Sequence, residues 1–177
     1  AGEGNSASPS PSTDGQHVWV FFSTGILACY DFQGKEQWKF DVGERFGEID
    51  IQFGMASTPL LVGDFLYLQL IHGVLDKADN TRSGQVIKLD KLSGDTVWVY
   101  ERITQAGYEC KQSYASPVLY DDGQYKFVIA HGADCTTGHS LDTGEELWRL
   151  SGLNGPSDIN TRHDDTFRFV ASPAVAP

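Results

Sequence analysis

The sequence predicts an all-β fold in which a four-stranded antiparallel unit recurs along the chain. Three observations support this prediction. Runs of β-branched and aromatic residues, such as HVWVFF at 17–22 and YKFVIA at 125–130, are separated by short glycine turns, which is typical of strands joined by tight turns. The phrase Ala-Ser-Pro recurs, and a glycine precedes a tryptophan at one fixed spacing. No long helical periodicity interrupts this pattern, and 40% hydrophobic residues suffice for a packed core.

The Ala-Ser-Pro phrase marks the beginning of each unit. It occurs at Ala7–Pro9, Ala115–Pro117 and Ala171–Pro173, and a copy with one additional residue occurs at Ala56–Pro59. The copies start 49, 59 and 56 residues apart, and an alternating apolar run follows each of the first three. A recurring unit of this kind is characteristic of repeat folds and is considered before any catalytic motif.

A second feature closes each unit. The second strand-like run ends in an aspartate, and the three aspartates are Asp31, Asp90 and Asp142. A glycine turn then leads to a tryptophan four residues later, and the pairs are Gly34 and Trp38, Gly94 and Trp98, and Gly144 and Trp148. A constant offset inside a variable period indicates one structural unit whose loops vary in length.

Tight-turn sequences divide each unit into four strands. STDGQ, DFQGK, LSGD and DDGQ contain glycines that can supply a positive φ. Four-stranded antiparallel units repeating at this length predict a β-propeller. We place the blades near residues 6–42, 56–101 and 114–150, with the first strand of a further blade near residue 168. A WD-type propeller is disfavoured because no blade ends in Trp-Asp.

The unit resembles the quinoprotein-type (PQQ-like) propeller repeat, whose tryptophan-docking motif has the form Ala-x-Asp-x-x-Thr-Gly-x-x-x-Trp. SLDTGEELW and KLDKLSGDTVW match this motif well, and CYDFQGKEQW matches it more loosely, with Cys29, Lys88 and Ser140 in place of the alanine. The resemblance covers nearly the whole chain. It implies that the three tryptophans dock against the next blade and bind neighbouring blades together.

Three blades do not make a closed ring. Propellers have about 4–8 blades, and closing the ring removes the exposed strand edges of an open sheet. The sequence therefore predicts an incomplete propeller of about three blades plus the first strand of a fourth. We expect further blades to come from additional sequence or from a partner chain.

The long loops are expected on one face of the propeller. Loops between strands one and two and between strands three and four share one face, and the remaining connections share the other. The second set contains the long loops, over residues 43–55, 72–83, 102–113 and 151–166. Binding residues usually lie on the loops of a rigid scaffold, so this long-loop face is the expected functional surface. Its candidate binding residues are His72, Arg82, His131, Asp134, Arg162, His163 and Asp164.

Two stretches contain residue types that catalysis or metal binding could use. HGADCTTGHSLDTGEELW at 131–148 holds two histidines and several carboxylates, and TRHDD at 161–165 is the strongest candidate for a metal or acid–base site. The repeat gives Asp142 and Gly144 a structural role, and a solvated loop is the favoured interpretation of TRHDD. A histidine beside a turn forms hydrogen bonds more often than it ligates a metal. We therefore expect no catalytic residue, no cofactor and no metal.

The three cysteines are too few for a disulfide scaffold. Cys29 lies inside a predicted strand and is expected to be a buried free thiol. Cys110 and Cys135 are expected at the same end of blade three, so a disulfide between them is geometrically allowed, and two free thiols are the alternative.

Charge and composition limit the classes of partner that this chain is expected to bind. A net charge of −11 repels phosphate backbones, so nucleic-acid binding is disfavoured. No run of about 18 apolar residues is present, so no membrane span is expected. The leading hypothesis is a non-enzymatic scaffold that binds a protein or surface partner through the long-loop face.

Two alternatives remain open. One is a fragment of a PQQ-dependent dehydrogenase, which is disfavoured because that resemblance implies two adjacent cysteines beside the quinone, and this chain has none. The other is the extracellular sensor propeller of a membrane-anchored serine/threonine kinase. The resemblance to secreted bacterial repeat proteins implies a periplasmic or extracellular location.

Overall fold

Three four-stranded antiparallel sheets form the part of the protein that the structure describes, each with its strands in chain order. The computed structural model describes residues 7–76, 81–104, 106, 108–153 and 169–176. Blade one consists of β1 (Ser12–Thr13), β2 (His17–Phe21), β3 (Ile26–Asp31) and β4 (Glu36–Asp41). Blade two consists of β5 (Leu60–Val62), β6 (Phe65–Asp76), β7 (Thr81–Asp90) and β8 (Thr96–Glu101). Blade three consists of β9 (Val118–Asp121), β10 (Lys126–Gly132), β11 (Cys135–Ser140) and β12 (Glu146–Ser151).

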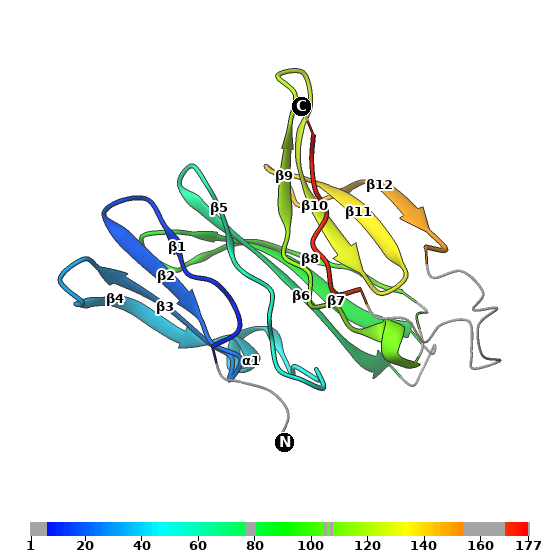
Figure 1. Ribbon diagram of the computed structural model, residues 1–177, viewed down its shortest axis with the longest axis horizontal. Helices are drawn as coiled ribbons and strands as arrows, with labels where there is room; N and C mark the ends of the chain where they lie inside the picture. Colours follow the sequence, from blue (N-terminus) through cyan, green and yellow to red (C-terminus); the bar gives the residue numbers. More distant parts are fainter. Residues whose placement is uncertain (1–6, 77–80, 105, 107, 154–168, 177) are drawn as a thin grey trace.

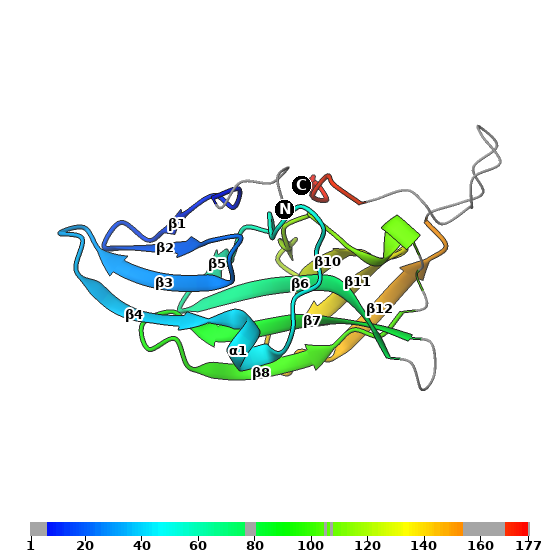
Figure 2. The ribbon, with the colours of Figure 1, turned by 90° about the horizontal axis from the view of Figure 1, so that it is seen from below.

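The predicted all-β fold of four-stranded antiparallel blades is confirmed. The three blades follow one another in sequence order across the molecule, as Figures 1 and 2 show. The described helices are short and lie in the connections between blades: α1 (Val42–Phe46) after blade one and the 3₁₀ helix η1 (Tyr108–Lys111) before blade three. Asp41 caps α1, because its carboxylate accepts hydrogen bonds from the backbone N–H groups of Gly43 and Glu44.

The structure differs from the sequence prediction at one of the long loops. The loop expected over residues 72–83 is shorter, because β6 and β7 continue pairing up to Asp76 and Thr81 after a register shift beyond Leu70. The strand predicted from near residue 168 stays a prediction: within the described residues 169–176, Phe169 forms a single parallel bridge to Ser113. A strand is held by a ladder of hydrogen bonds, and no described strand pairs with this segment.

Indole rings join each blade to the next. The indole N–H of Trp38 donates to the carbonyl of Lys91 at 3.0 Å, and that of Trp98 donates to the carbonyl of Leu141 at 3.2 Å. Each ring lies on the glycine turn of the next blade, so that a methyl group on Gly94 would come 2.8 Å from Trp38 and one on Gly144 would come 2.6 Å from Trp98. Only glycine fits these turns, which also require a positive φ.

Trp148 has no following blade among the described residues, so its docking against a next blade stays a prediction. Its side chain is 37% exposed, whereas Trp38 and Trp98 are half-buried. No described sheet follows blade three, so no glycine turn is present there to receive the ring. Trp148 packs on its own blade instead, over Gly138 and edge-to-face with Phe127 at 5.7 Å between ring centres.

The largest apolar cluster fills the junction between blades one and two. It includes Trp19, Phe21 and Leu27 from blade one and Leu66 and Ile87 from blade two, all buried. Trp19 and Phe21 alternate along β2 with more exposed residues, whereas Leu66 and Ile87 lie in stretches of β6 and β7 that are buried on both faces. At about 25 cal/mol per Å² of apolar surface removed from water, burial of this kind is the main stabilising contribution at the junction.

The recurring Ser/Thr-Pro steps form a hydrogen-bonded series across the blades. Each step uses a backbone N–H as donor and the hydroxyl of the following repeat as acceptor, in the order Ser10 to Thr58 (3.0 Å), Thr58 to Ser116 (2.8 Å) and Ser116 to Ser172 (2.9 Å). In the first unit, the residue that is equivalent to Thr58, Ser116 and Ser172 is therefore Ser10. It lies two residues after Ser8, the serine of the Ala-Ser-Pro copy that begins at Ala7. Residues 169–176 thus lie beside blade three as the start of blade three lies beside blade two.

We predict that Trp98 and Trp148 differ in their effect on stability. Trp98→Ala removes an indole packed on Gly144 and should lower the free energy of unfolding by about 3 kcal/mol, at the low end for large aromatic truncations. Trp148→Ala removes a more exposed ring and should cost no more than about 1 kcal/mol. Urea denaturation of both variants beside the wild type measures the difference. Equal losses would contradict the assignment of Trp98 as a joint between blades.

Candidate functional site

The long-loop face carries cavities at several points along the blades. This face holds the β2–β3, β6–β7 and β10–β11 connections together with the segments that lead from one blade to the next. Cavities of about 380, 240 and 200 Å³ open on it. The first lies between blades two and three, the second beside α1 at the end of blade one, and the third between blades one and two.

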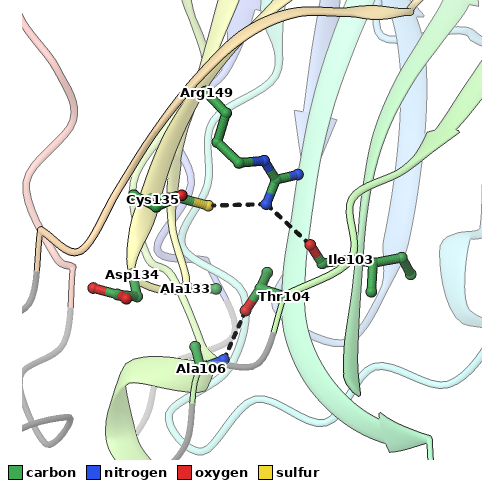
Figure 3. Close-up of a pocket in the computed structure, with 8 residues that line it drawn as sticks. Ile103, Thr104, Ala106, Ala133, Asp134, Cys135 and Arg149 are labelled. Atoms are coloured by element: carbon green, nitrogen blue, oxygen red, sulfur yellow. Dashed lines mark hydrogen bonds between the residues drawn. The ribbon is translucent and has the colours of Figure 1, made fainter. Parts of the chain in front are cut away.

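The cavity between blades two and three is the largest of these (Figure 3). Its wall comes from the segment after β8, the β10–β11 turn and the end of β12. Arg149 is held by Glu146, with two bonds at 2.6 and 2.7 Å, and it donates to the carbonyl of Ile103 at 3.0 Å. The turn residues Ala133 and Asp134 both have a positive φ, of 50° and 61°, which is uncommon outside glycine and fits a two-residue hairpin turn.

Arg102 lies behind this cavity, fully buried, and ties blade two to blade three. Its Nε donates to Thr137 Oγ1 at 2.9 Å, and its Nη2 donates to the carbonyl of Cys135 at 2.7 Å and to the sulfur at 2.8 Å. Its Nη1 has no hydrogen-bond partner among the described residues. Burial lowers the pKa of Arg102. A buried guanidinium that donates to backbone and thiol groups positions two blades rather than performing chemistry.

Two histidines of blade three are engaged in hydrogen bonds. His139 is fully buried, with Nε2 2.8 Å from Thr137 Oγ1, Nδ1 3.1 Å from the carbonyl of Gly144, and its ring edge-to-face with Tyr100. Burial lowers the pKa of His139 to about 4. His131 Nδ1 lies 2.6 Å from Thr136 Oγ1, and burial lowers its pKa as well. Both rings are therefore neutral at pH 7.

The cavity between blades one and two has a different lining. Phe46, Gly47 and Glu48 border it from the segment after blade one, and His72, Ser83, Gln85 and Glu101 border it from blade two. Gln85 Nε2 donates to Glu101 Oε1 at 2.7 Å and to the carbonyl of Phe46 at 3.2 Å. Burial is the main effect on the pKa of His72 and lowers it, although nearby carboxylates act in the opposite direction. This cavity is acidic.

The sequence-predicted binding residues are distributed between these two junctions. His72 lines the cavity between blades one and two, and Asp134 lines the cavity between blades two and three. His131 is the penultimate residue of β10, and its ring contacts the ring of Phe169. Arg82 lies on β7, and its side chain is outside the described residues, as are Arg162, His163 and Asp164. The candidates therefore do not form one site in the described part of the chain.

The cysteines are all buried free thiols. The disulfide that the sequence allowed between Cys110 and Cys135 is not present, because each sulfur lies in a separate environment. Cys135 faces the guanidinium of Arg102, whereas Cys110 packs with Ile71 and Ala106 in a small apolar cluster. Burial raises the pKa of Cys135, so it is a thiol rather than a nucleophilic thiolate at neutral pH.

Sequence reasoning missed the polar residues that line or support the cavities. Gln85 and Glu101 occupy ordinary strand positions, and Arg102 follows a strand directly. Only Gln85 has a signal in the sequence: it is a polar residue at a strand position where the alternation predicts an inward-facing apolar side chain. Gln85 also donates to Phe46, 39 positions away, and Arg102 donates to Thr137, 35 positions away, so these contacts depend on residues outside their own blade.

The part of the chain that the structure describes lacks metal-ligand clusters and long apolar helices. Nowhere in this part of the chain do three His, Cys, Asp or Glu side chains come together in an arrangement that could hold a metal ion. The helices described are also too short, and too low in apolar character, to include a transmembrane span.

Comparison with known proteins identifies a family and several solved structures that resemble this chain. A family model described as outer membrane protein assembly factor BamB matches residues 2–175. BamB from Moraxella catarrhalis is similar in structure, with a TM-score of 0.62 and 18% identity, over 97% of this chain and 45% of that one. A europium-containing methanol dehydrogenase has a TM-score of 0.56 and 14% identity, over 80% of this chain and 31% of that one.

A quinohemoprotein alcohol dehydrogenase from Comamonas testosteroni has a TM-score of 0.53 and 17% identity, over 88% of this chain and 22% of that one. At these identities the likeness shows the fold. The chain spans less than half the length of each of these structures. None of the curated proteins matches it in sequence.

We predict that acidification from pH 6.5 to pH 4 destabilises the protein through His139. The unfolded histidine takes up a proton near pH 6.5, but the folded one does so only near pH 4. The unfolded state therefore binds more protons in this window, and the free energy of unfolding falls as the pH falls, by at most about 1.4 kcal/mol per pH unit for one histidine. Urea denaturation across this range measures it, and His139→Gln should flatten the slope. A slope unchanged in the variant would contradict the assignment.

We also predict three thiols and no disulfide. In the absence of reductant, a colorimetric thiol reagent should react slowly with the folded protein, because all three sulfurs are buried. After unfolding in guanidinium chloride it should titrate three thiols per chain. Titration of a single thiol would instead show that Cys110 and Cys135 are bonded.

Proposed function

Because this chain belongs to the family of the outer membrane protein assembly factor BamB, we propose that it is a non-enzymatic β-propeller scaffold that binds a protein partner through its long-loop face. The family description supports a role in the assembly of outer membrane proteins, and we propose that role for this chain. A location in the periplasm or outside the cell follows from the same proposal.

The distribution of structure between the two faces supports this proposal. The opposite face is made of tight turns, such as those at Gly34, Gly94 and Gly144, two of which receive an indole from the preceding blade. The long-loop face carries α1, η1 and the cavities at both blade junctions. A rigid set of blades that presents irregular segments on one side is suited to recognising a partner's surface.

Two exposed apolar residues on this face are candidate contacts for a partner. Ile103 follows β8, borders the cavity between blades two and three, and is 43% exposed. Leu153, beyond β12, is also exposed at this end of the blades. Exposed aliphatic side chains beside polar groups such as Arg149 and Asp134 give a mixed surface typical of protein interfaces.

A PQQ-dependent dehydrogenase is the alternative that the structural neighbours raise, since two of them are alcohol or methanol dehydrogenases. The residues of this chain do not fit the quinone site that the PQQ-like resemblance implies. Cys29, Cys110 and Cys135 are far apart in the sequence and none is adjacent to another. The described residues also lack a group of His, Cys, Asp or Glu suited to a metal. We therefore favour the scaffold.

We predict that an acidic substitution on the long-loop face abolishes partner binding. Ile103→Asp places a charge where we expect apolar contact, and Leu92→Asp makes the same change in a β7–β8 turn on the opposite face, where the side chain is 57% exposed. Affinity purification of the tagged full-length protein from bacterial envelopes should recover a partner whose yield falls about tenfold or more with Ile103→Asp, since each 1.4 kcal/mol corresponds to a factor of ten.

The control variant Leu92→Asp tests whether the loss of binding is specific to the long-loop face. Leu92→Asp should leave the yield of the partner unchanged. Loss of the partner with Leu92→Asp alone, or retention with both variants, would contradict binding through the long-loop face.

A further inference from the structure

We propose that the cavity between blades one and two binds a basic side chain, lysine or arginine, that a partner protein inserts into it. This acidic cavity is the one lined by Glu48, His72, Gln85 and Glu101. The inference rests on the proposed function for the source of the side chain, and it adds the chemistry by which that partner is recognised.

Gln85 provides an acceptor that has no donor in the described part of the protein. Its side chain is 9% exposed, and its Oε1 is buried without a hydrogen-bond partner among these residues. Both of its amide hydrogens are used, toward Glu101 Oε1 and the carbonyl of Phe46. These two neighbours are acceptors, so they fix the amide with nitrogen toward them and exclude the flipped orientation. The oxygen is therefore a buried acceptor in the cavity lining that lacks a donor among the described residues, and a basic group that enters far enough would supply one.

The two carboxylates that line the cavity favour binding of a cation. Glu48 and Glu101 line it, and among the Lys and Arg side chains that the structure describes, which do not include that of Arg82, none forms an ion pair with either. The nearby cation Lys111 is paired with Asp50 at 3.1 Å. Arg45 is directed elsewhere, with its guanidinium over Phe40 and donating to the carbonyl of Gly94. His72, whose pKa is lowered by burial, contributes no positive charge at pH 7.

The number and type of groups favour a side chain over a metal ion. The described residues offer no set of three His, Cys, Asp or Glu that could ligate a metal here. A cavity of about 200 Å³ also exceeds what one ion needs. A lysine carries three N–H donors and an arginine five, which match one amide oxygen and two carboxylates. Their aliphatic part can lie along Phe46. The net charge of −11 attracts a basic partner over longer range.

The test uses small probes rather than the partner. Nα-acetyl-arginine methylamide and the corresponding lysine compound are titrated into the ¹⁵N-labelled full chain, and the side-chain amide signals of Gln85 are followed by NMR. We expect a saturable shift of these signals. The citrulline compound has the shape of arginine without its charge and should leave them unchanged.

Matched variants show whether the carboxylates are responsible. Glu48→Gln combined with Glu101→Gln should weaken binding of the arginine probe about fivefold or more, as expected for two partly exposed ion pairs. Glu145→Gln removes a carboxylate from a β11–β12 turn on the opposite face and should leave binding unchanged.

Three outcomes would overturn the inference: no saturable shift, an equal shift with citrulline, or a shift caused by calcium ions and not by the basic probes. These probes report on the cavity alone. Failure of the proposed function would appear separately, as partner binding that does not depend on Ile103.

Discussion

An indole that leaves the last strand of one blade must find a turn without a side chain on the next blade. Trp38 on Gly94 and Trp98 on Gly144 meet this requirement, and each also needs a backbone carbonyl for its N–H. The contact fixes the distance and angle between successive sheets, and therefore the shape of every cavity that opens between them. The hydroxyl series through Thr58 adds a second point of attachment on the same junctions.

The two described junctions are stabilised by different means. Between blades one and two, an apolar cluster around Trp19 is dominant. Between blades two and three, buried polar groups carry much of the attachment. The side-chain amide of Gln69 donates to the carbonyl of His131 at 2.8 Å and accepts from the backbone N–H of His131 at 2.9 Å. Lys88 donates to the carbonyl of Leu141 at 2.7 Å, and its ammonium lies over Phe65. Such groups are costly to bury unless satisfied, so they favour one geometry strongly over others.

The sequence predicted the blades because their signals are local. Alternation, glycine turns and the fixed spacing to Trp38 each depend on a few consecutive residues. It predicted less well where the outcome depends on neighbours distant in the chain. Trp148 has the same local pattern as Trp98, yet its exposure is decided by whether another sheet lies beside it. The acceptor oxygen of Gln85 is defined by groups from two blades, which no local pattern reveals.

The shared carbonyl of Lys91 has an optical consequence. It accepts the N–H groups of both Trp19 and Trp38, at 2.8 and 3.0 Å, so half of the four tryptophans meet at one point in the molecule. Chromophores held this close exchange excitation energy and couple their transitions. The near-ultraviolet signal of the protein is therefore weighted toward a single seam between two sheets, and separating those sheets would alter the spectrum while the hydrogen bonding within each remained intact.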